Sequence, residues 1–166
     1  IELLNIILPL ASDLTDRTYA RYLSQVLGLL HTAAQEYLDK VAGPLRAAGL
    51  TVSTTIHQGD AATYIVDEAQ KQPDTLIAMS THGRTGLQRG ILGSVTDKVL
   101  HSTSVPMLVF RPPDEGKATE GSVSIRTVVV PLDGSELSEG VLPYAEELAR
   151  RLGLDIVLVE SVSLMS

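Results

Sequence analysis

The sequence of 166 residues contains no cysteine and no tryptophan, and five tyrosines and one phenylalanine are its aromatic residues. Without cysteine, a disulfide framework, a thiolate zinc site and a catalytic cysteine are all excluded. So few aromatic rings also leave little surface on which nucleobases could stack.

Basic side chains are outnumbered: 13 Lys and Arg stand against 20 Asp and Glu, for a formal net charge of −7. Binding to nucleic acid or to an anionic membrane depends on basic surface, so we expect neither partner. No apolar run reaches the length of about 20 residues that spans a bilayer. The apolar start, IELLNIILPLA, lacks the basic n-region of a signal peptide. These absences favour a cytoplasmic protein.

Short apolar runs alternate with amphipathic segments along the chain. This alternation predicts an α/β fold with a doubly wound parallel sheet. The runs expected to form strands, of which the first, third and last read as buried, are residues 1–8, 50–56, 75–79, 105–110, 126–132 and 155–162.

The helices are expected between these runs. Residues 11–29 are ambiguous and suggest a loop or cap before a short helix, and residues 32–48 form an amphipathic helix in which Pro44 favours a kink. Asp60 is placed to cap the next helix, and residues 137–152 form a further one with Gly153 at its C-terminus.

Several glycines lie between Gly83 and Gly93, directly after the strand at residues 75–79 and before a short helix. In such a turn, backbone N–H groups converge on an anion at the positive end of the helix, and the Ser94 hydroxyl could add to them. Open α/β sheets bind ligands at this end of a strand. The alternative is that the glycines only form an irregular connection. We call residues 83–93 the glycine-rich segment. It matches neither a Walker A loop nor the Rossmann fingerprint Gly-x-Gly-x-x-Gly.

The stretch MSTHGRTGLQRGILGSVTDKVL, followed by SVPMLVFRP, resembles the ATP-binding segment of the universal stress proteins. The family pattern is G-x2-G-x9-G-[S/T]. Gly83, Gly93 and Ser94 fit it, whereas Ser80 replaces the first glycine. If that position needs a positive φ or a close approach of the backbone to the ligand, serine is disfavoured there. The stretch VVVPLDGSELSEGVLPYAEELARRLG resembles the family's opening strand and helix.

The resemblance implies a five-stranded sheet in the order 3-2-1-4-5, Rossmann-like and similar to the adenine nucleotide alpha hydrolases. It also implies binding of ATP or AMP, with or without Mg²⁺. His82 would form a hydrogen bond with a phosphate or shape the turn, and Arg84 would neutralise phosphate or remain solvated. Asp133 would hold Mg²⁺ through the nucleotide or stabilise a structural turn. The residues that fall at the family's contact positions are Met79, Ser80, Gly83, Gly93, Ser94 and Val95 for ribose and phosphates, Pro131 and Asp133 for adenosine, and Ile7 (or Val162) for adenine.

The order of the elements differs from that of one family domain. Residues 1–111 resemble a domain without its first strand and helix, residues 112–125 a linker, and residues 126–166 strand 1, helix 1 and strand 2 of a second copy. Alternatively, Pro9-Leu10 echoes Pro131-Leu132 and the chain begins at strand 1. The strand at residues 126–132 could complete the first sheet in cis or enter a partner chain. We expect a homodimer, with a strand swap as one route to it.

Two functions are compatible with these residues. One is a regulatory module that binds adenine nucleotide without turnover. The other is an interaction domain of the same family that has lost the ability to bind nucleotide. No HExxH or GxSxG motif and no metal-ligand spacing is present, so we expect no enzyme and no metal site of the protein's own.

Overall fold

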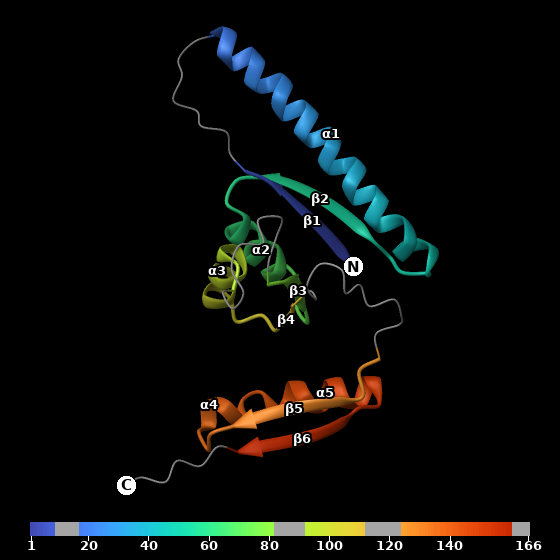
Figure 1. Ribbon diagram of the computed structural model, residues 1–166, viewed down its shortest axis with the longest axis vertical. Coiled ribbons are helices and arrows are strands. Elements are labelled where there is room, and N and C mark those ends of the chain that lie inside the picture. The colour runs from blue at the N-terminus through green and yellow to red at the C-terminus, as the bar shows by residue number, and fades with distance from the viewer. Residues whose placement is uncertain (9–16, 82–91, 112–123, 161–166) are drawn as a thin grey trace. The chain divides into compact units, whose positions relative to one another are not determined.

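The computed structural model describes residues 1–8, 17–81, 92–111 and 124–160. The chain divides into two compact units, Ile1–Asp114 and Glu115–Ser166. Each unit alternates strands with helices, and each described strand pair is parallel (Figure 1). The α/β class expected from the sequence is therefore confirmed.

The first unit opens with β1 (Glu2–Ile7), α1 (Arg17–Ala47) and β2 (Ser53–Gln58). β1 and β2 pair in parallel, and α1 packs against both (Figure 1). The buried residues of α1 are Ala34, Leu38 and Ala42, which recur at intervals of four and so lie on one face of the helix.

The loop or cap expected within residues 11–29 is placed by its polar residues outside the described residues, and the helix expected after it begins at Arg17. That helix is not short, because it continues without a break into the helix expected over residues 32–48. Leu23, Leu27 and Leu30 extend the apolar spacing of the later turns, which gives the helix one stripe along its length. Pro44 lies inside the helix, which ends three residues later at Ala47.

The rest of the first unit is α2 (Ala61–Gln70), β3 (Ile77–Ser80), α3 (Ser94–Ser102) and β4 (Met107–Phe110). As expected, Asp60 caps α2: its Oδ1 atom accepts the Thr63 N–H at 3.0 Å. β3 pairs in parallel with β4. The two helices and β3 share one core, which consists of Ala62, Val66, Ala69, Ile77 and Val99.

The turn between β2 and α2 is tightly packed. Gly59 has a φ of +146°, and a Cβ atom added there would lie 2.6 Å from Cε2 of Tyr64. The Tyr64 ring stacks on the His57 ring with centroids 4.5 Å apart. A side chain at position 59 would therefore be strained and would also displace this stack.

The second unit contains β5 (Thr127–Leu132), α4 (Glu136–Glu139), α5 (Leu142–Leu152) and β6 (Asp155–Glu160). The single helix expected over residues 137–152 is wrong, because it divides at Gly140. Pro143, in the first turn of α5, has no N–H with which to continue the α4 ladder. The predicted end of the helix is confirmed, since Gly153 adopts the left-handed conformation with φ +66°.

In the part of the chain that the structure describes, the strands form three two-stranded sheets, β1–β2, β3–β4 and β5–β6. The order 3-2-1-4-5 stays a prediction. The expectation that the first and last strands are buried is wrong: β1 is half-buried, and every residue of β6 is exposed. Each described strand has a hydrogen-bonded neighbour on one edge.

Candidate functional site

A cavity of about 280 Å³ lies at the carboxyl end of β3, where α3 begins. This end of a parallel strand is where open α/β sheets bind ligands. The cavity therefore lies where the sequence predicts a site. It is lined by Met79, Ser80, Thr81, Gly93, Ser94, Val95 and Thr96.

Hydrogen bonds join the end of β3 to the start of α3, across the glycine-rich segment. The Gly93 N–H donates to the Thr81 carbonyl at 2.7 Å, and the Thr96 hydroxyl donates to the Ser80 carbonyl at 2.9 Å. The Thr81 N–H in turn donates to the Phe110 carbonyl of β4 at 2.9 Å. The end of β3 and the start of α3 are thus held together, and Thr81 is fixed to β4.

The first turn of α3 supplies backbone donors at the cavity. Gly93 is the N-cap and makes no side-chain capping bond, and the first intrahelical bond runs from the Asp97 N–H to the Gly93 carbonyl at 2.9 Å. The N–H groups before Asp97 have no acceptor within the helix, and the dipole makes this end positive. Such an arrangement can bind an anion, since the donors and the dipole act together.

Ser80 fits its position without backbone strain. Over the described ranges, Asp74 is the non-glycine residue with a positive φ, and Ser80 lies in β3. The family's glycine is therefore not required here by φ. The serine replaces it at no conformational cost.

The structure brings five of the predicted site residues together and separates others. Ile7 lies at the end of β1, outside the lining of the cavity, where its carbonyl accepts the Gly59 N–H at 2.9 Å. His82, Gly83, Arg84 and Val162 lie outside the described residues. The five residues that line the cavity are Met79, Ser80, Gly93, Ser94 and Val95.

Pro131 and Asp133 belong to the second unit, at the end of β5. Asp133 Oδ1 accepts the Ser135 hydroxyl at 2.7 Å and the Ser135 N–H at 3.0 Å. Hydrogen bonds with the Ser135 hydroxyl, then the Ser138 side chain, then the Ser135 N–H lower the pKa of Asp133 to about 2. The carboxylate thus holds the turn before α4, as the structural alternative predicts. Its contact with nucleotide or Mg²⁺ stays a prediction.

Two lining residues, Thr81 and Thr96, were not among the residues predicted from the sequence. Thr96 is 3% exposed, and its position three residues before Val99 places it on the buried face of α3. A polar residue on the apolar face of a helix must find a hydrogen-bond partner. This mismatch was the signal in the sequence that could have identified it.

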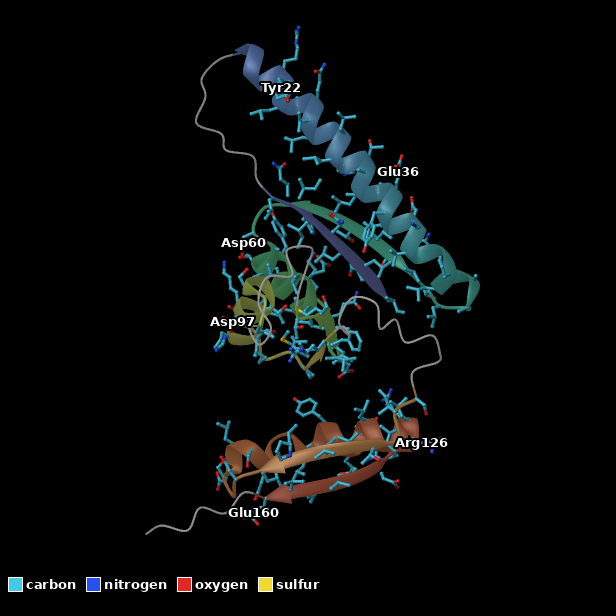
Figure 2. All side chains as sticks on the ribbon, viewed as in Figure 1. Tyr22, Glu36, Asp60, Asp97, Arg126 and Glu160 are labelled. Carbon is cyan, nitrogen blue, oxygen red and sulfur yellow. The ribbon has the colours of Figure 1, made fainter. Side chains whose placement is uncertain are left out.

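Other kinds of site were sought within the same described ranges. No three His, Asp or Glu side chains there are grouped so that they could hold a metal ion. No helix there has both the length and the apolar character needed to cross a membrane. Figure 2 shows two of the acidic residues of the first unit: Asp60 at the start of α2 and Asp97 in the first turn of α3.

A family model described as the universal stress protein family matches residues 2–111. The chain belongs to the universal stress protein family. The match begins in β1 and ends just after β4, so it includes the cavity at the end of β3. The resemblance noted in the glycine-rich segment is therefore confirmed at the level of the family.

Curated relatives carry the same family name. Universal stress protein MJ0531 of Methanocaldococcus jannaschii is 39% identical over 85 residues, which are 51% of this chain and 50% of that protein. A universal stress protein of Mycolicibacterium smegmatis is 30% identical over 109 residues, 66% of this chain and 35% of that protein. The chain thus spans half or less of the length of these two relatives.

Solved structures of similar proteins have the same fold. The structure of MJ0577 from M. jannaschii matches with a TM-score of 0.59 and 25% identity, over 68% of this universal stress protein and 76% of that chain. A putative universal stress protein from Pseudomonas aeruginosa matches with a TM-score of 0.54 and 19% identity, over 96% of this chain and 60% of that chain. The second match shows the fold alone, over residues of both units.

Proposed function

We propose that this universal stress protein binds an adenine nucleotide, ATP or AMP, in the cavity at the end of β3. The observation that carries the proposal is the uncapped start of α3, where Gly93 and Ser94 line the cavity. Free N–H groups at the positive end of a helix suit the phosphates of a nucleotide. The formal net charge of −7 disfavours long anions such as nucleic acid, so a small anionic ligand is the better match.

The lining residues divide the cavity by chemistry. Gly93 leaves the approach to the helix start free of a side chain, and the exposed Ser94 hydroxyl can donate to a phosphate oxygen. Met79 and Val95 supply apolar surface beside these donors. We assign the phosphates to the Gly93–Ser94 side and the ribose to the Met79 side. Any Mg²⁺ would enter on the phosphates of the nucleotide.

The role we propose is regulation in a stress response, in the cytoplasm. Nucleotide binding would add contacts between the end of β3 and the start of α3, which are already joined through Thr81 and Gly93. A ligand that binds only the folded form stabilises it in proportion to the logarithm of its concentration over Kd. Occupancy would therefore report the level of ATP or AMP as a change in the stability of this edge of the sheet.

Isothermal titration of the chain with ATP, AMP and cyclic AMP tests the proposal. We expect saturable binding of ATP or AMP at one site per chain. Adenosine serves as the matched control, because it lacks the phosphates that the α3 amides are proposed to bind. Absence of heat and of any thermal stabilisation with all three nucleotides would contradict the proposal.

The alternative is a domain of the same family that assembles through a sheet edge and binds no nucleotide. β4 favours it: in the described chain its hydrogen-bonded neighbour is β3 on one edge, and Leu108 and Phe110 are 54% and 56% exposed. Exposed apolar edge strands pair readily with other strands. Under this alternative, Leu108→Lys would convert an assembled species to monomer in sedimentation velocity, whether or not nucleotide is present.

A further inference from the structure

We propose that Thr96 is a positioning residue for the phosphate side of the cavity, acting through the Ser80 carbonyl rather than on the ligand. This inference rests on the proposed function. In the described part of the chain, Thr96 is the one polar residue that is buried, with 3% of its surface exposed. Its hydroxyl donates to the Ser80 carbonyl at 2.9 Å. A neutral hydrogen bond buried in this way is costly to break, because the carbonyl would lose a partner away from water.

The direction of the Ser80 carbonyl explains why the Thr96 hydroxyl can reach it. In a strand, the backbone groups of successive residues point to opposite edges. The N–H groups of Ile77 and Thr81 both donate to carbonyls on the β4 side, those of Pro106 and Phe110. Ser80 precedes Thr81 by one residue, so its carbonyl points away from β4. The β3–β4 ladder does not use this carbonyl, and the Thr96 hydroxyl from α3 reaches it.

This bond acts together with the bond from the Gly93 N–H to the Thr81 carbonyl. Ser80 and Thr81, at the end of β3, are thereby tied to Thr96 and Gly93, which lie on either side of Ser94 and Val95. The two bonds hold the start of α3 against the end of β3. The Ser94 and Val95 amides then remain beside the cavity before any ligand arrives. Preorganised donors bind an anion more tightly because they need no rearrangement.

Two substitutions separate the hydroxyl from the packing of the side chain. Thr96→Val keeps the shape and removes the donor, whereas Thr96→Ser keeps the donor and removes a methyl group. In the free protein, we expect Thr96→Val to speed exchange of the Gly93 amide hydrogen by about fivefold, the effect of losing one net hydrogen bond. Thr96→Ser should leave this exchange within about twofold of the unsubstituted rate. Should Thr96→Val fail to fold, Thr96→Ala removes the same donor.

The second measurement is titration with ATP and with adenosine. We expect Thr96→Val to weaken ATP binding by about fivefold and adenosine binding by less than about twofold, with Thr96→Ser close to the unsubstituted protein. Unchanged Gly93 exchange in Thr96→Val would overturn the positioning role. Faster exchange with unchanged ATP affinity would overturn its link to the phosphates and leave a structural bond. If the unsubstituted protein binds no nucleotide, the proposed function is wrong, and the exchange data still decide whether Thr96 positions the helix.

Discussion

The Nζ atom of Lys98 lies 3.0 Å from Oδ1 of Asp60, the same oxygen that caps α2 through Thr63. One carboxylate therefore stabilises the start of α2 and ties it to α3, which carries the proposed site. Hydrogen bonds from the Thr63 side chain and backbone, then from Lys98, lower the pKa of Asp60 from 3.8 to about 2. The side chains of Asp60 and Lys98 are 52% and 56% exposed, so salt should screen their attraction.

The first prediction concerns acid stability. Because the pKa of Asp60 is lower in the folded protein, its contribution is present above pH 3.8 and is lost as the pH falls toward about 2. Asp60→Asn keeps an oxygen that can cap α2 but cannot titrate. Thermal melts between about pH 6 and about pH 2.5, which cover the upper part of this range, should show a smaller loss of Tm on acidification for Asp60→Asn. Parallel curves for the two proteins would contradict the assignment.

The second prediction concerns the phosphate side of the cavity. Gly93→Val places a branched side chain at the start of α3, where Gly93 lines the cavity, and should lower ATP affinity by more than about tenfold, the loss of roughly 1.4 kcal/mol of binding free energy. The φ of Gly93 is −58°, which valine tolerates, so the fold should persist. Gly28→Val is the matched control. It lies in α1, where an added Cβ meets nothing within 4 Å. Equal ATP affinity in Gly93→Val and Gly28→Val would show that ATP does not bind in the cavity.

The third prediction is that ATP turnover is absent or well below about 1 s⁻¹, the low end of ordinary enzymes. The lining of the cavity contains hydroxyl and apolar side chains and no carboxylate, histidine or lysine within the described chain. No group there can act as a general base at neutral pH. Phosphate release would be followed with the purified protein. A rate of several turnovers per second that one substitution in the cavity abolishes would show that a catalytic group had been missed.

The fourth prediction concerns how the first sheet is completed. Over the described residues, β1 and β3 each have one hydrogen-bonded neighbour, so each has an edge that a further parallel strand could join. Unpaired backbone groups are costly once an edge is buried. The segment Thr127–Leu132 is a parallel strand of suitable length, and we predict that the β5 strand of a second chain joins these edges. Light scattering should then show a dimer. A stable monomer would rule out the swap.

The sequence predicts the positions of the strands better than it predicts their burial. An apolar run such as residues 155–160 favours a strand, and β6 forms there, but the run does not specify what covers it. All residues of β6 are exposed, and its hydrogen-bonded neighbour in the described chain is β5. Covering layers depend on contacts distant in sequence, which a local pattern does not contain.

The helix boundaries show a similar division. Gly153 at the end of α5 and Asp60 at the start of α2 were predicted, because each acts through local backbone geometry. The continuity of α1 through residues 17–47 was not, because a local pattern does not show whether two neighbouring helical segments join into one helix. Thr96 was missed for a different reason. Its partner, the Ser80 carbonyl, is set by the pairing of β3 with β4, which lies beyond the reach of a motif.

The hydrogen bond between Thr81 and Gly93 has a consequence for how this site could diversify. It fixes the end of β3 directly to the start of α3, through backbone atoms alone. Changes of sequence or length between Thr81 and Gly93 should therefore leave the strand, the helix and the Ser94 amide in their places. A library confined to the residues between these two positions would test whether they set the selectivity of the cavity for anions of different size.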